Sequence, residues 1–245
     1  MDKSLYSEMA FLETRHWWFL GRRAIIFDVI KRFCGSPSGK ALDVGIGTGI
    51  NGVLLSKAGY SVDGVEDSEE AMLYVKKNYP GISVLKTSFP SSSIPPTSYN
   101  LVTMLDVVEH MEDDISALKA ARQALVPGGY VVITTPAFSF LWTKHDELAH
   151  HKRRYRKKEL KVKLKEAGFE TLFISYFNFF LFPAIVAFRI LGKTASKEKS
   201  ISDFSSTPDF LNFPFAKLFS SERFLMRLFS LPFGVSLIAV GQKSV

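Results

Sequence analysis

Cysteine is almost absent from the sequence, since Cys34 is the only one among 245 residues. A single cysteine excludes a disulfide within the chain and is typical of proteins kept in a reducing compartment. Long apolar runs are also absent, because no stretch reaches the ~20 residues that a membrane-spanning helix needs. The first ten residues, MDKSLYSEMA, lack the apolar core of a signal peptide. These absences predict a cytoplasmic protein that does not cross the membrane.

Acidic residues are outnumbered by basic ones, 24 to 31, which gives a formal net charge of +7. Such a surface favours anions, whether phospholipid, nucleic acid or an acidic substrate. Hydrophobic residues make up 47% of the chain and charged residues 22%. That balance excludes wholesale disorder and allows a sizeable core. The length predicts one large domain, or one domain with an insertion.

One strand–loop–helix–strand unit organises the first third of the chain. A short apolar strand, 41–44, leads into three alternating glycines, Gly45, Gly47 and Gly49. A helical pattern follows, and a second apolar strand ends on Glu66. Glycines let the backbone approach a ligand closely, and the start of the helix presents free N–H groups. An acid at the end of the second strand can accept both hydrogens of a ribose diol, so the unit predicts a nucleoside cofactor.

Two registers of the glycine loop are compatible with this pattern. Residues 47–52 satisfy the G-x-G-x-x-G pattern of dinucleotide-binding proteins, but the strand would then continue to Ile46 and bury Asp43 in its middle. An unpaired buried carboxylate is costly. A loop that starts at Gly45 instead places Asp43 at the carboxyl edge of the sheet, where ligands of open α/β sheets bind. We therefore favour the second register.

Three stretches carry a resemblance to a known family. LDVGIGTG, residues 42–49, resembles the first motif of the class I S-adenosylmethionine (SAM)-dependent methyltransferases. The buried strand Tyr99–Leu105 is followed by DVVEHM, which resembles the family's motif after strand four. The turn LVPGG, residues 125–129, is also similar to that of the family. The flanking HWWF-x-x-RR and HD-x(3)-H-x-x-RRY patterns resemble a branch near the ubiquinone-type O-methyltransferases.

The resemblance implies SAM as cofactor and S-adenosyl-L-homocysteine as product. It places Asp43 and the three glycines around the methionine part and Glu66 on the ribose. Ser88 stands near the position at which relatives often carry an acid for the adenine, so a hydroxyl or backbone group must serve there. The expected cofactor-binding residues are Asp43, Gly45, Gly47, Gly49, Glu66, Asp67, Ser88, Leu105 and Asp106.

The expected fold class is α/β, with a doubly wound, seven-stranded Rossmann-like methyltransferase sheet. Residues 1–36 are expected to form an N-terminal helical cover, and residues 37–177 the SAM-binding core. Residues 178–233 form a Phe-rich helical insertion between strands six and seven, as a substrate roof or membrane contact. Residues 234–245 then supply the last strand of the core sheet.

The N-terminal cover contains an aromatic and basic stretch, HWWFLGRR, at residues 16–23. One interpretation is an amphipathic helix that uses Trp17 and Trp18 to cover the core. The other is a lid whose aromatic and basic groups close over cofactor or substrate, as in similar methyltransferases. Trp17 and Trp18 are therefore candidate substrate-contacting residues.

Histidine is the usual general base near neutral pH, and a hydroxyl acceptor must lose a proton. His110, His145 and His150 all follow strands at the ligand edge of the sheet and are the candidate catalytic residues. Structural hydrogen bonding is the alternative for each. The spacing of His145, His150 and His151 with Asp146 and Glu147 also suggests a metal site, but ligands must converge and the pattern does not show that they do. We expect no metal ligands.

The densest basic run spans residues 152–158. Arg153, Arg154 and Tyr155 are candidates for binding the carboxylate or phosphate of a substrate, or an anionic headgroup. The alternatives are the solvated start of a helix at 159–167 and an RNA-binding surface. No further basic stripe with interleaved aromatics accompanies the run, so nucleic acid is not the expected partner.

Phenylalanine is concentrated late in the chain, with 14 of the 22 between residues 173 and 233. Residues 215–231 have helical spacing, and Glu222 falls within the expected apolar face, where it either pairs with a base or faces the substrate cavity. A basic amphipathic helix can lie in a membrane interface. The alternatives are a roof over the active site and a dimer contact. Residues 193–206 are expected to form a polar linker. The apolar face is predicted to consist of Phe215, Leu218, Phe219, Leu225, Met226 and Phe229.

The sequence thus predicts a methyltransferase that moves a methyl group from SAM to a small apolar or lipid-linked acceptor, at oxygen. The alternatives are an RNA or protein methyltransferase that uses the run at 152–158, and an NAD-binding or non-catalytic Rossmann-like module. The expected location is cytoplasmic, with contact at the inner membrane face. The sequence leaves the oligomeric state open.

Overall fold

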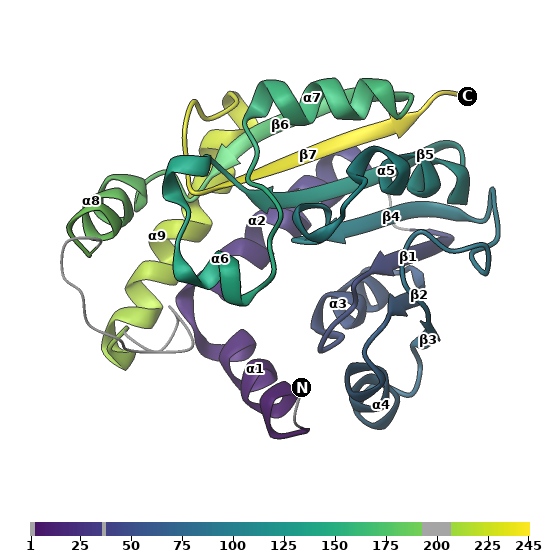
Figure 1. The fold of residues 1–245 in the computed structure, drawn as a ribbon, viewed down its shortest axis with the longest axis horizontal. Coiled ribbons are helices and arrows are strands. Elements are labelled where there is room, and N and C mark those ends of the chain that lie inside the picture. The colour runs from purple at the N-terminus through teal and green to yellow at the C-terminus, as the bar shows by residue number, and fades with distance from the viewer. Residues whose placement is uncertain (1–2, 36–37, 193–206) are drawn as a thin grey trace.

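A computed structural model describes residues 3–35, 38–192 and 207–245, and Figure 1 shows its fold. Within these residues seven strands form one sheet in the spatial order β3-β2-β1-β4-β5-β7-β6. In chain order the strands are β1 (Lys40–Val44), β2 (Ser61–Glu66), β3 (Ser83–Lys86), β4 (Tyr99–Leu105), β5 (Leu125–Pro136), β6 (Phe169–Phe177) and β7 (Ser236–Lys243).

The first five strands run parallel to one another, and β7 is antiparallel to both β5 and β6. This arrangement confirms the predicted doubly wound sheet with an antiparallel last strand. The carboxyl ends of the parallel strands consequently meet at one edge of the sheet. Loops that leave β1, β2, β4 and β5 are brought together there, which is where ligands of open α/β sheets bind.

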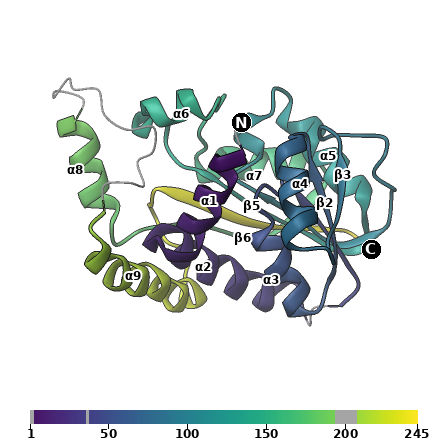
Figure 2. The ribbon, with the colours of Figure 1, turned by 90° about the horizontal axis from the view of Figure 1, so that it is seen from below.

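Helices cover both faces of the sheet (Figures 1 and 2). Helices α5 and α7 contribute to one apolar cluster, and α2, α3, α4 and α9 to the other. Two buried faces explain why the central strands are apolar throughout. In chain order the helices are α1 (Lys3–Arg15), α2 (Trp17–Phe33), α3 (Ile50–Ala58), α4 (Glu69–Asn78), 3₁₀ helix η1 (Val108–His110), α5 (Asp114–Ala124), 3₁₀ helix η2 (Ser139–Leu141), α6 (Lys144–Leu148), α7 (Lys157–Glu166), α8 (Phe182–Gly192) and α9 (Asp209–Leu228).

The N-terminal region forms a pair of helices, α1 and α2, with His16 as the N-cap of the second. Helix α2 lies against the sheet and beside α9 (Figures 1 and 2). Trp17 joins it to α9, because its backbone N–H donates to Asn212 Oδ1 (3.1 Å) and its indole packs on Phe215 and Phe219. The geometry therefore places Trp17 in a helix–helix contact rather than over a ligand.

Two element boundaries differ from the sequence prediction. Strand β5 begins at Leu125, within the stretch 125–129 that was expected to form a turn, because Leu125 pairs with Tyr99 across a register shift in β4. Helix α9 begins at Asp209, so Pro214 lies inside it. A proline there removes one helical hydrogen bond. The contact between α9 and α2 stabilises the additional residues at the start of the helix, 209–214.

The buried face of α9 differs from the predicted one. Ala216, Phe219, Glu222 and Met226 are buried, whereas Leu218 and Phe229 are exposed. The helix is thus rotated relative to the expectation, because its contact with α2 selects the face centred on Phe219. The large apolar side chains left exposed on α9 are Phe210, Phe213, Leu218, Phe224 and Leu228.

Glu222 is fully buried where α9 meets the segment that precedes α8. Its Oε1 accepts hydrogen bonds from the backbone N–H groups of Phe179 (2.8 Å) and Phe180 (3.0 Å). The prediction that it pairs with a base is wrong, because these partners are main-chain amides. Its position inside the helix contact also gives no support to the predicted substrate role. Burial raises the pKa of Glu222 to about 7.

The unmodified protein is expected to lose stability between pH 4.5 and pH 7, and replacing Glu222 with glutamine is expected to abolish this pH dependence. The folded-state pKa lies above the value of about 4.5 in the unfolded chain, so stability is complete below pH 4.5 and falls as pH rises through 7. This fall in the free energy of unfolding of the unmodified protein amounts to roughly 2–3 kcal/mol. Urea denaturation of both proteins from pH 4.5 to pH 8 measures it. A constant difference in free energy of unfolding across this range would contradict the raised pKa.

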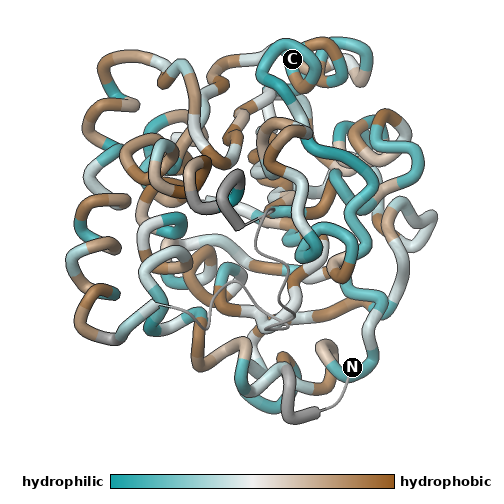
Figure 3. The backbone as a smooth tube through the Cα atoms, turned by 60° about the vertical axis from the view of Figure 1, so that its left-hand side comes forward, coloured by the Kyte–Doolittle hydropathy of each residue, from teal (hydrophilic) through white to brown (hydrophobic). Residues whose placement is uncertain are grey.

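Hydrophobic residues occur along the central strands and also on the outer helices, as the hydropathy colouring in Figure 3 shows. Among the described residues, no helix is both long enough and apolar enough to cross a membrane. The predicted polar linker at 193–206 lies outside the described residues.

Candidate functional site

The glycine loop begins where the favoured register puts it. Strand β1 ends at Val44, and the N–H groups of Gly45 and Ile46 both donate to the carbonyl of Val65 (2.8 and 3.1 Å). Gly45 and Gly47 have φ angles of 67° and 55°, in the left-handed region that favours glycine. The strand does not continue through Ile46, so the dinucleotide register is wrong.

Glu66 closes the loop from the end of β2. Its Oε2 accepts a hydrogen bond from the N–H of Gly47 (2.9 Å), and its Oε1 accepts one from the N–H of Ser68 (3.1 Å). Burial raises the pKa of this carboxyl above its ordinary value. A carboxylate offers about four acceptor positions, so two remain for the hydroxyls of a ribose.

Asp43 lies beneath the loop with only 2% of its surface exposed. Its Oδ1 accepts a hydrogen bond from the hydroxyl of Thr103 (2.6 Å), and burial raises its pKa to about 6 although Thr103 and Arg22 oppose the shift. A buried carboxylate beside free helix-start N–H groups fits a ligand that carries an ammonium group. Together with the acceptor positions on Glu66 and the open space beside Gly47, this arrangement fits the amino-acid and ribose parts of SAM.

Arg22 connects the N-terminal helices to the sheet edge. One guanidinium nitrogen lies 2.8 Å from Asp106 Oδ2 and donates to the hydroxyl of Thr134 (2.8 Å), which donates in turn to Asp106 Oδ1 (2.9 Å). The guanidinium also lies over the ring of Trp18 at 5.1 Å. Arg22 was not among the predicted site residues, although its place after the aromatic pair was a signal for it.

Helix α1 lies over the glycine loop at two points. The hydroxyl of Thr48, in the loop, donates to the carboxylate of Glu13, and the hydroxyl of Tyr6 donates to Ser68 Oγ (2.9 Å) just after β2. These contacts join α1 to the glycine loop and to the segment after β2, and the lid interpretation of residues 16–23 stays a prediction. The sequence pattern gave no sign of Tyr6 or Glu13.

The remaining predicted cofactor residues lie at or just after the carboxyl ends of β2, β3 and β4. Asp67 follows β2, Ser88 follows β3, and Leu105 is the last residue of β4. The first two side chains are exposed and Leu105 is half-buried. All three therefore lie toward the edge that carries the glycine loop, and their cofactor contacts stay predictions.

Of the histidines that the sequence singled out, the structure brings His110 together with His151, whose ring centroid is 4.7 Å away. His145 lies on α6 at 6.3 Å from the ring of His151, and His150 is exposed. The fully buried Glu109 joins the pair, and its carboxylate oxygens have no hydrogen-bond partner among the described residues. Burial and the charge of Asp106 raise the pKa of Glu109 well above its ordinary value. The predicted bases thus belong to one cluster only in part.

The basic run is not a solvated surface at its centre. Arg154 is buried and pairs with Asp146 through two hydrogen bonds (2.8 and 2.9 Å). The buried Tyr155 donates to Asp114 Oδ2 (2.6 Å), and Arg153 lies 3.0 Å from the same oxygen. The prediction that these three side chains bind substrate finds no support in this geometry, because internal acidic partners hold them.

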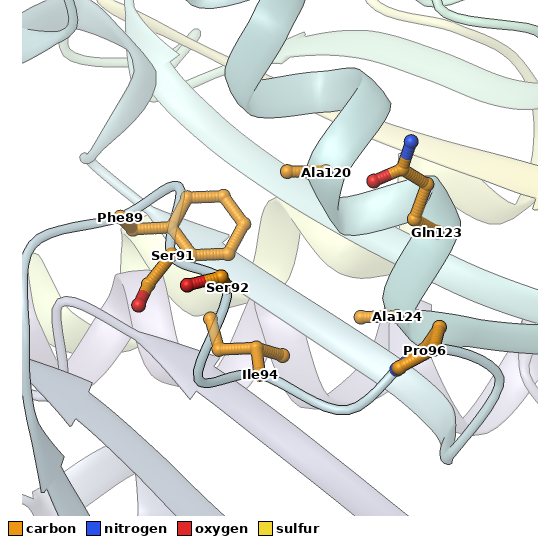
Figure 4. Close-up of a pocket in the computed structure, with 8 residues that line it drawn as sticks. All are labelled: Phe89, Ser91, Ser92, Ile94, Pro96, Ala120, Gln123 and Ala124. Carbon is orange, nitrogen blue, oxygen red and sulfur yellow. The ribbon is translucent and has the colours of Figure 1, made fainter.

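Figure 4 shows a pocket of about 170 Å³ between the loop after β3 and the last turns of α5. That end of α5 lies beside the start of β4, since the N–H of Thr97 donates to the carbonyl of Gln123 (2.9 Å). The pocket therefore extends toward the edge of the sheet opposite the glycine loop and is not the candidate site. Its lining consists of Phe89, Ser91, Ser92, Ile94, Pro96, Ala120, Gln123 and Ala124.

Comparisons with solved structures agree with the fold. Across 99% of this chain and 97% of the other, the structure is similar to a complex titled as the Haloferax volcanii Trm112 methyltransferase activator and the putative methyltransferase (TM-score 0.65, 14% identity). It is also similar to a SAM-dependent methyltransferase, titled as a possible histamine N-methyltransferase, from Thermotoga maritima (TM-score 0.59, 19% identity, 99% and 98% covered). At these identities the likeness shows the fold alone.

Sequence comparisons identify the relatives. The chain is 25% identical over 161 residues to a probable S-adenosylmethionine-dependent methyltransferase of Mycolicibacterium smegmatis, covering 65% of this chain and 62% of that protein. It is 32% identical over 117 residues to a ubiquinone biosynthesis O-methyltransferase of Hydrogenovibrio crunogenus, covering 44% and 47%. The matches thus span about half to three fifths of these relatives. The family model described as a methyltransferase domain matches residues 18–172, which is more than half of the sequence. The loop geometry and these matches agree, and the chain belongs to the methyltransferase domain family.

Proposed function

We propose that the protein transfers a methyl group from SAM to an oxygen of a small apolar or lipid-linked acceptor. The observation that carries the proposal is an aromatic cluster near the edge that holds the glycine loop. Phe138, after β5, stacks on Tyr176 near the end of β6 (4.9 Å, 8° between planes) and lies 5.9 Å from Phe182 of α8. Phe233, before β7, lies 5.2 Å from Phe182. Such a wall favours an apolar acceptor over a charged one.

SAM supplies the electrophilic methyl group, and the chain's own residues contribute alignment. Asp43 and Glu66 would hold the amino-acid and ribose parts, with Gly47 leaving room for the cofactor at the loop. Arg22 and Asp106 fix the sheet edge beside it. Other side chains must then remove the proton from an acceptor hydroxyl.

The cluster of Glu109, His110 and His151 is the group we assign to that proton. Its residues lie in the segments that follow β4 and β5, on the same edge of the sheet as the glycine loop. His145 and His150 rank behind it as catalytic candidates, because neither is part of the cluster. In this cluster an imidazole, of His110 or His151, would accept the proton of the acceptor hydroxyl as a general base.

The alternative functions are less well supported. An RNA or protein methyltransferase would need an accessible basic run, yet Arg153 and Arg154 are held by Asp114 and Asp146. Incubation with methyl-labelled SAM tests the choice directly. We expect the label in an alkyl phenol or in the organic phase of a membrane lipid extract. Label in transfer RNA or in protein instead would overturn the acceptor class.

The outer face of α9 supports the proposed contact with the inner membrane face. Phe213 and Leu228 expose 70% and 79% of their surface, and Lys217 and Arg223 lie over the rings of Phe213 and Phe224. Exposed aromatic side chains combined with cations suit an anionic lipid surface. We place the protein in the cytoplasm on this basis together with its single cysteine.

Substituting both Phe213 and Phe224 with serine is expected to weaken binding to anionic vesicles about 100-fold. Replacing each ring removes roughly 1.5 kcal/mol of the free energy of transfer to the membrane, so the double substitution removes about 3 kcal/mol. Flotation with phosphatidylglycerol vesicles measures the effect. Leu73→Ser, an exposed apolar position on α4, is the matched control and should float like the unmodified protein. Flotation of the double variant at the unmodified level would exclude this face.

A further inference from the structure

Three side chains of metal-ligand type converge from two separate loops. Glu109 and His110 end the segment after β4, and His151 follows α6 in the segment after β5. One ligand atom from each lies within 4.8 Å of the other two. A backbone hydrogen bond holds the loops in register, from the N–H of Lys152 to the carbonyl of Glu109 (2.7 Å).

Glu109 is the side chain that requires a partner. It is 0% exposed, and in the part of the chain that the structure describes neither carboxylate oxygen receives a hydrogen bond. Removing an unpaired carboxylate from water costs several kcal/mol. The nearby guanidinium of Arg22 is engaged with Asp106 and Thr134 instead. A cation bound beside Glu109 would satisfy it.

Both imidazoles are oriented by groups behind them. His151 Nδ1 lies 2.8 Å from Asp146 Oδ1, so Nε2 is the nitrogen left for a ligand. Asp146 is fully buried and is fixed by Arg154 and by the N–H of Thr143 (2.8 Å). The ring of His110 lies next to the backbone of Ala149. Ligating histidines in proteins characteristically hydrogen-bond a carboxylate or a backbone carbonyl in this way.

We propose that Glu109, His110 and His151 bind a divalent transition-metal ion such as Zn²⁺, Mn²⁺ or Co²⁺. Two imidazole nitrogens and one carboxylate oxygen suit these ions better than Mg²⁺ or Ca²⁺, which prefer oxygen ligands. Bonds of about 2.1 Å place ligand atoms roughly 3–3.5 Å apart, so the ion closes the cluster by about an ångström. The sequence pattern directed attention to His145 and Asp146 and did not include Glu109, so this proposal departs from the expectation of no metal ligands.

Three protein ligands leave at least one coordination position open, as in catalytic metal sites. An acceptor hydroxyl bound there would lose its proton more readily, as metal-bound water does. In this respect the inference rests on the proposed function and deepens it, since an ion held by Glu109, His110 and His151 would promote loss of the proton in place of a free imidazole of the cluster. Metal binding itself needs no acceptor and is measurable without one.

The test is titration of the full chain with Co²⁺, followed by calorimetry and by the visible absorption that reports nitrogen and oxygen ligands. We expect one equivalent to bind, with affinity at least tenfold lower in both Glu109→Gln and His151→Ala. His150→Asn is the matched control, because His150 is adjacent in sequence, lies outside the cluster and has a φ angle of 56° that asparagine tolerates. Zn²⁺ should displace the Co²⁺ absorption.

Absence of stoichiometric binding by the unmodified chain would overturn the proposal, as would equal binding by Glu109→Gln. Loss of binding in His150→Asn to the same extent would also do so, since it would place the ion elsewhere. Circular dichroism melting of each variant separates lost ligands from lost fold. If Co²⁺ binds as expected and no acceptor is methylated, the metal site stands and the proposed acceptor fails.

Discussion

Replacing Glu66 with alanine is expected to weaken the binding of S-adenosylhomocysteine by about 100-fold. The carboxylate already fixes the loop through the N–H groups of Gly47 and Ser68, and it has positions left for two ribose hydroxyls. Hydrogen bonds to a charged group contribute roughly 1.5 kcal/mol each, so losing two costs about 3 kcal/mol. Every 1.4 kcal/mol is a factor of ten in the dissociation constant. Calorimetric titration with S-adenosylhomocysteine and with SAM measures the change.

The control for this substitution lies on the same strand. Asp63, also on β2, accepts a hydrogen bond from the hydroxyl of Tyr99 (3.0 Å) and is remote from the loop. Asp63→Asn keeps an acceptor for Tyr99 and should bind S-adenosylhomocysteine like the unmodified protein. Glu66→Gln should fall between the two, because an amide oxygen accepts from one backbone N–H but its NH₂ group cannot accept from the other. Equal affinity in Glu66→Ala and Asp63→Asn would remove Glu66 from the cofactor site.

The affinity for SAM is expected to fall as pH decreases below about 6. Burial raises the pKa of Asp43 to about 6, so the empty site loses this negative charge in that range. A neutral carboxyl attracts the ammonium group of the cofactor less than a carboxylate does. Titrations between pH 5 and pH 8 test this, with Asp43→Asn as the variant that should be weak throughout. A flat profile for the unmodified protein would place Asp43 away from the ammonium group.

The cofactor loop could be predicted from sequence because its determinants are local. Gly45, Gly47 and Gly49 require positive φ within five residues, and Glu66 follows at the end of the next strand. The cost of burying Asp43 in mid-strand decided the register without any tertiary information. Sheet order followed from the resemblance of two motifs that lie about sixty residues apart.

The network around that loop depended on long-range contacts that no pattern reveals. Arg22 reaches Asp106 across 84 positions, and His151 approaches Glu109 across 42. Each pair joins segments whose meeting is set by the sheet topology. A run of basic residues looks solvated when each residue is considered alone, and only the fold shows that Arg154 has a buried partner.

The orientation of α9 illustrates the same limit. Its apolar residues outnumber the positions on one face, so hydrophobic spacing alone permits more than one buried face. The contact with α2 selects the face of Phe219, where the close approach is possible because Gly21 has no Cβ; a Cβ there would lie 2.4 Å from the ring of Phe219. This orientation buries Glu222, and backbone N–H groups donate hydrogen bonds to its carboxylate.

Substituting Arg154 with methionine is expected to lower the free energy of unfolding by about 3–5 kcal/mol. Removing one partner of a buried ion pair leaves the other charge uncompensated. Asp146 is fully buried, and Arg154 supplies two of its hydrogen bonds while also donating to the carbonyl of Ala137 (3.1 Å). Methionine keeps an apolar side chain of similar reach, so packing is largely retained. Urea denaturation at pH 7 measures the loss.

Arg153 provides the comparison, because it is the neighbouring residue and also pairs with an aspartate. Its side chain is 30% exposed, and Asp114 keeps the ammonium of Lys163 at 2.8 Å and the hydroxyl of Tyr155 when Arg153 is removed. Arg153→Met should therefore cost less than about 1 kcal/mol. If both variants lost the same small amount, the Arg154–Asp146 pair would be no more than a surface contact. A loss confined to Arg154→Met would instead show that the middle of the basic run holds the loop that carries His151.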